Sequence, residues 1–163
     1  MKKILISACL LGNKVRYDGR SLAVRDRILE RWLSEGRVVS VCPEVEGGLG
    51  IPRQPAEILA GSGEDVLKGE ADVVGQKGHT LTREFLAGAS VALELCRQFD
   101  IDIAVLAELS PSCGSSAVYD GSFSGRKIAG MGVTAALLRQ NGVQVFSQYE
   151  IADADALLHG KNR

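Results

Sequence analysis

The chain of 163 residues lacks several features that mark common functional classes. Its formal net charge is −1, so there is no excess of basic residues to attract nucleic acid. Aromatic residues make up only 5%, which disfavours a surface on which bases stack. No stretch is apolar enough to span a bilayer. We therefore expect an ordinary globular protein with neither nucleic acid nor membrane as a partner.

Two further absences concern the cysteines. The sequence has no Cys-x-x-Cys pair, which argues against zinc ribbons and the standard ferredoxin spacings. The apolar run Ile4–Ala8 before Cys9 is shorter than the roughly 7–15 residues of a secretion signal. We therefore expect a cytoplasmic protein. In that compartment its four cysteines are thiols, metal ligands or catalytic groups rather than disulfides.

Apolar runs alternate with amphipathic stretches along the chain, an order typical of α/β proteins. Strands are predicted at Ile4–Ala8, Val38–Val41, Ile101–Leu109 and Val143–Phe146. Helices are predicted at 22–35, with Gly36 as the stop, and at 80–99, 133–140 and 151–158. Loops are predicted at 43–63 and 114–130, and a small hairpin within 64–78. We expect one domain over 1–163, a Rossmann-like three-layer α/β fold with a mostly parallel sheet and helices on both faces.

Three of the four cysteines follow a predicted strand directly. They are Cys9, Cys42 and Cys113. In an open parallel sheet, ligands bind outside the carboxyl ends of the strands, so we expect these thiols to meet at one point. Cys96 lies instead on the apolar stripe of the predicted helix 80–99, and we interpret it as core packing.

Three thiolates suit two kinds of metal site. A zinc ion would need a fourth ligand, and the two histidines, His79 and His159, are expected to face solvent. A cubane iron–sulfur cluster needs no further side chain if one iron has no protein ligand. Such an iron is a Lewis acid soft enough to bind sulfur.

Polar residues beside the cysteines are candidates for catalysis and binding. Glu44 follows Cys42 by two residues and is interpreted as an acid–base group, whereas Glu46 stays open between function and a solvated loop. Ser110 and Ser112 precede Cys113, where their hydroxyls bind substrate or cap the turn. Further candidates for substrate binding are Arg16, Tyr17, Gly48 and Arg53. For the two arginines, the alternative is an ordinary position on the surface.

These residues lie within longer motifs that resemble a bacterial family formerly known as a domain of unknown function. The motifs include Ser7-Ala8-Cys9-Leu10-Leu11-Gly12, Val15-Arg16-Tyr17-Asp18-Gly19, Val41-Cys42-Pro43-Glu44-Val45, Ser110-Pro111-Ser112-Cys113-Gly114 and Tyr119-Asp120-Gly121-Ser122-Phe123-Ser124-Gly125. The resemblance covers nearly the whole chain. Characterised members of the family are thiouracil desulfidases, which carry a 4Fe-4S cluster on three cysteines.

The resemblance implies an enzyme with a small thiolated base as its substrate. Its cluster ligands would be Cys9, Cys42 and Cys113, with one open iron, and its catalytic residues would be Glu44 and Ser110. We expect a non-redox desulfuration in which the open iron binds the sulfur of a thiouracil-like ring. Glu44 would activate water, and Ser110 would hydrogen-bond the ring or relay a proton. The products would be sulfide and the oxo-base.

One stretch departs from the family, and two other functions stay open. Members often carry basic residues just before the Ser-Pro-Ser-Cys-Gly motif, where this chain has Ala107-Glu108-Leu109. If such a basic group orients the substrate in the family, this protein would prefer a different substrate. The alternatives are a sulfur-transfer or redox enzyme with Cys113 as nucleophile, which would act without iron, and a non-catalytic cluster-binding sensor. The sequence leaves the oligomeric state and the choice between free base and nucleoside open.

Overall fold

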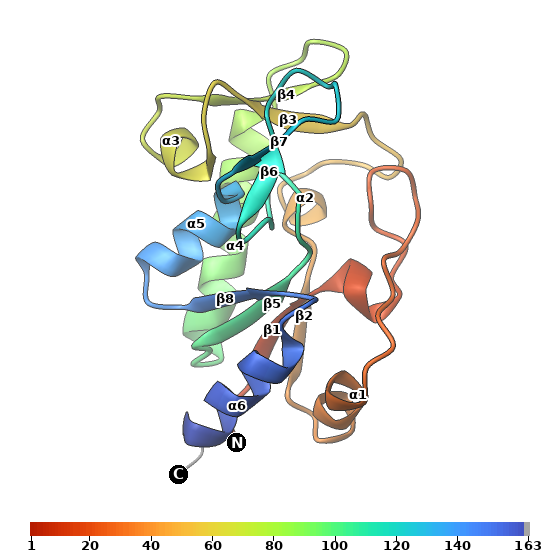
Figure 1. The fold of residues 1–163 in the computed structure, drawn as a ribbon, viewed down its shortest axis with the longest axis vertical. Coiled ribbons are helices and arrows are strands. Elements are labelled where there is room, and N and C mark those ends of the chain that lie inside the picture. The colour runs from red at the N-terminus through yellow and green to blue at the C-terminus, as the bar shows by residue number, and fades with distance from the viewer. Residues whose placement is uncertain (162–163) are drawn as a thin grey trace.

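The central sheet contains four parallel strands in the order β2-β1-β5-β8 (Figure 1). In this computed structural model, which describes residues 1–161, they are β1 (Ile4–Ser7), β2 (Val38–Val41), β5 (Ile103–Leu106) and β8 (Gln144–Ser147). The two inner strands, β1 and β5, are buried along their whole length. Strands covered on both faces read as continuous apolar runs, which is why the sequence reveals them. The predicted parallel sheet is confirmed.

Helices cover both faces of this sheet (Figure 1). The helices α4 (Thr82–Gln98) and α5 (Val133–Gln140) lie on one face, and α1 (Arg27–Ser34) and α6 (Ile151–Lys161) lie on the other. Successive side chains of a strand point to opposite faces. Accordingly, Leu5 packs in the core beneath α4 and α5, while its neighbours on β1 pack with α1 and α6. The predicted three-layer α/β fold is thereby confirmed.

Shorter elements follow the carboxyl ends of the strands and extend the molecule. In chain order they are the 3-10 helix η1 (Ala8–Leu11), α2 (Pro43–Glu46), β3 (Ala56–Leu59), α3 (Gly63–Leu67), β4 (Asp72–Gly75), β6 (Ala117–Tyr119) and β7 (Lys127–Ala129). The antiparallel pairs β3-β4 and β6-β7 lie above the central sheet in the view of Figure 1. Within residues 1–161, no helix combines the length and apolar character needed to cross a membrane.

The segments predicted as loops contain more structure than expected. Residues 43–63 include α2 and β3, and residues 114–130 include β6 and β7. The hairpin predicted within 64–78 is wrong in position, because β4 pairs with β3 across the intervening α3. The strands β3, β4, β6 and β7 contain only 3 or 4 residues each, and several of these residues are exposed. They therefore lack the long apolar alternation by which a strand is recognised in a sequence.

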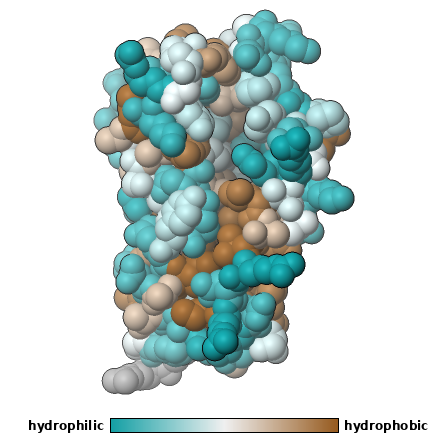
Figure 2. All heavy atoms as spheres, turned by 45° about the vertical axis from the view of Figure 1, so that its right-hand side comes forward, coloured by the Kyte–Doolittle hydropathy of each residue, from teal (hydrophilic) through white to brown (hydrophobic). Residues whose placement is uncertain are grey.

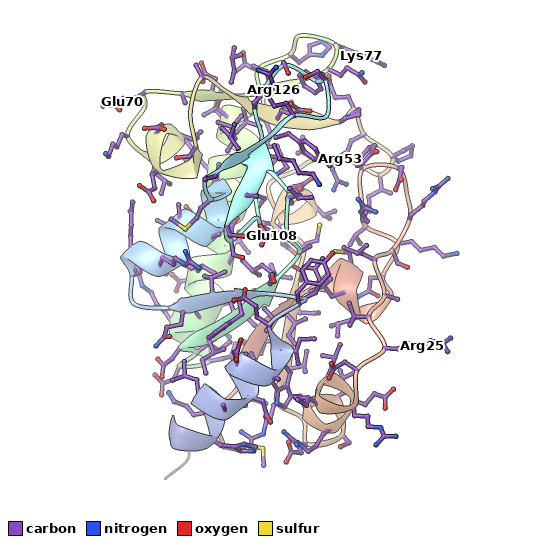
Figure 3. The ribbon with its side chains drawn as sticks, in the orientation of Figure 1. Arg25, Arg53, Glu70, Lys77, Glu108 and Arg126 are labelled. Carbon is purple, nitrogen blue, oxygen red and sulfur yellow. The ribbon has the colours of Figure 1, made fainter. Side chains whose placement is uncertain are left out.

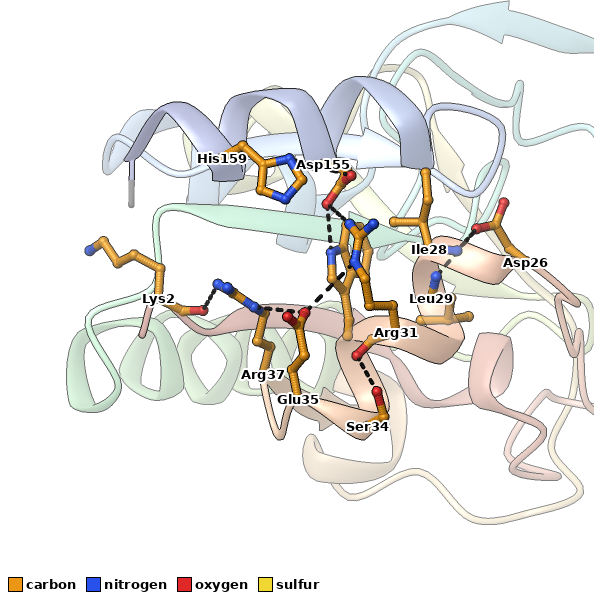
Figure 4. Close-up of polar contacts among 11 residues, drawn as sticks. Lys2, Asp26, Ile28, Leu29, Arg31, Ser34, Glu35, Arg37, Asp155 and His159 are labelled. Atoms are coloured by element: carbon orange, nitrogen blue, oxygen red, sulfur yellow. Dashed lines mark hydrogen bonds and ion pairs between the residues drawn. The ribbon is translucent and has the colours of Figure 1, made fainter. Parts of the chain in front are cut away.

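A buried polar contact joins the two helices α1 and α6 (Figure 4). The indole Nε1 of Trp32 donates a hydrogen bond of 3.0 Å to Asp155 Oδ1, and Arg31 forms an ion pair with the same carboxylate. Burial alone would raise the pKa of Asp155, but the hydrogen bonds from Arg31 and Trp32 outweigh it and lower this pKa below the ordinary carboxyl value. The charged carboxylate thus stabilises the packing of α1 against α6.

Replacing Asp155 with Ala should lower the free energy of unfolding by about 1–3 kcal/mol at neutral pH, because the Trp32 N–H loses its buried acceptor. A carboxyl with a lowered folded pKa stabilises above its unfolded pKa, and this contribution disappears as the pH falls through the folded value. Urea unfolding of wild type and variant should therefore converge in acid. The exposed Asp153→Ala, on the same helix, should have a smaller effect. An equal loss at both pH values would contradict the assignment.

Candidate active site

A cavity of about 520 Å³ lies at the carboxyl-end edge of the central sheet. Residues at or just after the end of each strand of the central sheet line it: Ser7, Val41, Ala107 and Gln148. Ligands of open α/β sheets bind at this edge, and the volume falls within the range of small-molecule sites. Figure 2 presents the side of the molecule to which the segments after β1 and β2 belong, and shows a hollowed band of hydrophobic side chains bordered by hydrophilic groups.

Three free cysteines line this cavity, and each comes from a different strand end. Cys9 lies in η1 after β1, Cys42 lies between β2 and α2, and Cys113 lies in the loop after β5. Burial, followed by the charge of the neighbouring Cys42, raises the pKa of Cys9 to about 11. Burial likewise raises the pKa of Cys42 and of the fully enclosed Cys113. The charges of Cys9 and Cys42 also raise the pKa of Cys113, as that of Cys42 does for Cys9, so the three thiols lie close enough to interact.

This donor set suits an iron–sulfur cluster better than a single ion. Among residues 1–161, no three His, Cys, Asp or Glu side chains converge closely enough to hold one metal ion. A cluster makes a different demand, because each cysteine binds a separate iron and the thiols surround a cube. The two histidines are exposed and do not line the cavity, as expected. Cys96 belongs to α4 and is buried in the core between this helix and the sheet, which confirms its interpretation as packing.

The carboxylate of Glu44 is fixed on the cavity wall by two partners. Its Oε2 accepts hydrogen bonds from Arg53 Nε at 2.9 Å and lies 2.8 Å from Arg53 Nη2, and its Oε1 accepts one from Ser110 Oγ at 3.1 Å. The Arg53 side chain is only 9% exposed, and it also donates to the carbonyl of Val15 at 2.9 Å. Figure 3 shows Arg53 and Glu108 pointing into the middle of the molecule, whereas Arg25 projects outward. Arg53 therefore ties the segments after β1 and β2 together at the cavity.

The hydroxyl of Ser110 uses all of its hydrogen-bonding capacity. It accepts hydrogen bonds of 3.1 Å from the backbone N–H groups of Ser112 and Cys113, and it donates to Glu44. A hydroxyl has one donor and two acceptor positions, so its proton is directed at the carboxylate. Ser110 thus shapes the turn that carries Cys113 and orients Glu44 at the same time.

The structure places some predicted binding residues on the wall and others away from it. Arg16, Tyr17 and Arg53 line the cavity. Ser112 is fully buried behind the wall, where its hydroxyl pairs with that of Thr134 at 2.7 Å. Gly48 is exposed and follows α2 with a left-handed φ of +101°, a conformation that favours glycine. Neither Ser112 nor Gly48 belongs to the lining of the cavity.

Glu108, which the sequence marked only as a departure from the family, organises the loop that follows Cys113. Its Oε1 accepts hydrogen bonds from the N–H groups of Ser115, Ser116 and Ala117 at 2.9, 3.1 and 3.2 Å. Its Oε2 accepts from both serine hydroxyls, at 2.9 and 3.0 Å. Burial acts to raise the pKa of Glu108, but these donors outweigh it and lower the pKa below the ordinary value. The carboxylate thus satisfies the N–H groups of the segment that leads from Cys113 into β6.

Several other lining residues escaped the sequence analysis. They are Glu57, Gln76, Tyr119, Phe123, Gln148 and Tyr149. Together with Tyr17, they bring all 3 tyrosines of the chain to this one cavity. Tyr119 and Phe123 belong to one of the motifs that carry the family resemblance, but the sequence predicts neither of them to be a site residue. Aromatic residues are scarce in this sequence, so each of them could have been considered as a candidate for the site.

Three comparisons place the chain among known proteins. A model of the family described as 2-thiouracil desulfurase matches residues 4–150. The chain is similar to YbbK of Bacillus subtilis (strain 168), an uncharacterized protein, with 45% identity over 150 residues that cover 92% of this chain and 98% of that protein. It is also similar to the solved structure of a 4Fe-4S-dependent thiouracil desulfidase, TudS. The TM-score is 0.89 and the identity 45%, over 98% of this chain and 99% of that chain.

Replacing Glu108 with Ala should lower the free energy of unfolding by about 1–3 kcal/mol, since three backbone N–H groups, two of them partly buried, lose their acceptor. Glu108→Gln keeps one oxygen for the backbone N–H groups, and serine hydroxyls can accept from its amide, so it should retain most of the stability. Guanidinium unfolding curves measure both variants. If Glu108→Gln lost as much stability as Glu108→Ala, the charge of the carboxylate, rather than the arrangement of its acceptor oxygens, would hold the loop.

Proposed function

This chain belongs to the 2-thiouracil desulfurase family, and from that premise we propose that it is a 4Fe-4S-dependent desulfidase. Its substrate would be a small thiouracil-like base, and its products the oxo-base and sulfide. The observation that carries the proposal is the meeting of three free cysteines with Glu44 and Ser110 in one cavity. This meeting supports the view that the chain retains the chemistry named for the solved relative.

Cys9, Cys42 and Cys113 would hold the cluster, and three ligands would leave one iron open. When bound, such a cluster supplies a soft Lewis acid that attracts the sulfur of a thiocarbonyl group. The apolar part of the wall, including Val15, Leu22 and Val41, would exclude bulk water from the reacting carbon. Arg16 and Tyr17 would bind the rest of the base. Ser112 and Gly48 lie off the wall, and the proposed binding set leaves them out.

Glu44 would act as the general base in a hydrolytic, non-redox reaction. It takes a proton from water, and the water oxygen forms a bond with the carbon that carries sulfur. The remaining proton of the added hydroxyl would pass to sulfur as the carbon–sulfur bond breaks. Sulfur then leaves as hydrosulfide with the bonding electron pair, the carbon becomes the carbonyl of the oxo-base, and Glu44 returns its proton to solvent. Carbon keeps its oxidation state, so no electron donor is required. Arg53 and Ser110 would hold Glu44 in position throughout.

The test is anaerobic reconstitution followed by incubation with 2-thiouracil. Sulfide and uracil should appear in equal amounts, and an iron chelator should abolish turnover. Cys113→Ala should lose both the bound iron and the activity, whereas Cys96→Ala, a buried cysteine of the core, should keep both. A cluster-loaded protein that releases no sulfide would sink the proposal and favour the sensor alternative. Turnover that survives iron removal would favour Cys113 as a nucleophile.

Replacing Glu44 with Gln should lower kcat about 100- to 10,000-fold, because the amide cannot accept the proton of water. The iron content should stay at the wild-type level, since the three cysteines are unchanged. The matched control is Glu46→Gln, two residues further on, where the side chain is exposed and does not line the cavity. Steady-state kinetics with iron analysis separates the two variants. A kcat for Glu44→Gln near that of wild type would exclude Glu44 as the base.

A further inference from the structure

We propose that Phe123 is a specificity-determining residue whose ring stacks on the planar ring of the substrate, and that Glu57 holds it in position. Phe123 lines the cavity from the loop between β6 and β7, far along the chain from the residues after β1 and β2. This inference rests on the proposed function, because it assumes that a heteroaromatic base enters the cavity.

The backbone of Phe123 has a conformation that needs an explanation. Its φ is +56°, in the left-handed region that bulky side chains rarely adopt. Its neighbours in the same loop, Gly121 and Gly125, have φ values of +93° and +80°, which glycine adopts without strain. A glycine at position 123 would remove the strain. Strained residues of this kind cluster at ligand sites, and Phe123 belongs to the lining of the cavity.

Glu57 on β3 supplies the contacts that hold this loop. Its Oε1 accepts hydrogen bonds from the N–H groups of Gly121 at 3.0 Å and of Phe123 at 3.2 Å. Gly121 also lies close against β3, because a Cβ on it would come within 2.6 Å of the carbonyl oxygen of Ile58. One carboxylate oxygen and one close backbone approach therefore fix the loop to β3. The backbone of Phe123 is thereby held at the cavity wall, from which its ring can meet a ligand.

A rigid aromatic ring on a cavity wall recognises ligands that are themselves planar and aromatic. Stacking of a base on an aromatic side chain tolerates changes in the base, because every base has a π-face. Phe123 would therefore favour substrates with a planar aromatic ring, whatever the position of the sulfur on that ring. The polar groups of Glu44 and Ser110 act at the reacting carbon, so the two tasks fall to different segments of the chain.

The experiment compares the cluster-loaded wild type with Phe123→Ala and Phe123→Tyr. For Phe123→Ala, KM for 2-thiouracil and the calorimetric Kd for uracil should both rise about tenfold or more, with kcat and iron content nearly preserved. Phe123→Tyr should recover most of the lost affinity. Phe99→Ala removes an aromatic ring that does not line the cavity and should leave both constants at the wild-type level. Unchanged constants in an active Phe123→Ala enzyme would overturn the inference alone.

The role of Glu57 is tested by rescue. Glu57→Ala should raise KM in the same direction as Phe123→Ala without lowering iron content, because the loop loses its acceptor. Glu57→Gln keeps that oxygen and should restore KM, which a direct contact between the charge and the substrate would not allow. A Gln variant as impaired as the Ala variant would overturn the positioning role. A cluster-loaded wild type without turnover would overturn the proposed function, and this inference with it.

Discussion

The common direction of the four central strands is the constraint on which the site depends. In a parallel sheet the chain leaves every strand at the same edge, so residues that follow different strands become neighbours there. Cys9, Cys42 and Cys113 each use this position, and the sheet order β2-β1-β5 makes their strands adjacent. The core clusters on the two faces of the sheet hold these strands in place. The stability of the fold and the geometry of the site therefore have one origin.

Carboxylates add to the short β3-β4 and β6-β7 ladders in holding the segments around the cavity. Glu44 accepts from Ser110 and Arg53, Glu57 accepts from the loop that carries Phe123, and Glu108 accepts from the loop after Cys113. Each one replaces backbone hydrogen bonds that irregular segments cannot make with one another. A charged acceptor forms stronger hydrogen bonds than a neutral one, which suits loops that must stay in place. The cavity wall is consequently preorganised for binding.

The sequence predicts the layers of this protein better than its connecting segments. Long apolar stretches identify the four central strands and the helices that cover them. The start of α1 is predicted too early, because Asp26 caps the helix by accepting from the N–H groups of Ile28 and Leu29. The strands β3, β6 and β7 stay hidden, because they are short and partly exposed. Their positions depend on contacts with distant segments instead of on a local pattern.

By itself the sequence determined the family, the α/β layers, the three strand-end cysteines and the separate role of Cys96. The family follows from the motifs that carry the resemblance, and the other properties follow from local patterns, namely apolar periodicity and the residue types at strand ends. Only the tertiary structure decided that Ser112 lies behind the wall, that Glu108 organises a loop, and that Glu57 and Phe123 reach the cavity. Hydrogen bonds between a carboxylate and the backbone of a remote loop leave no periodic trace in a sequence. Such contacts exist only once the sheet has brought the segments together.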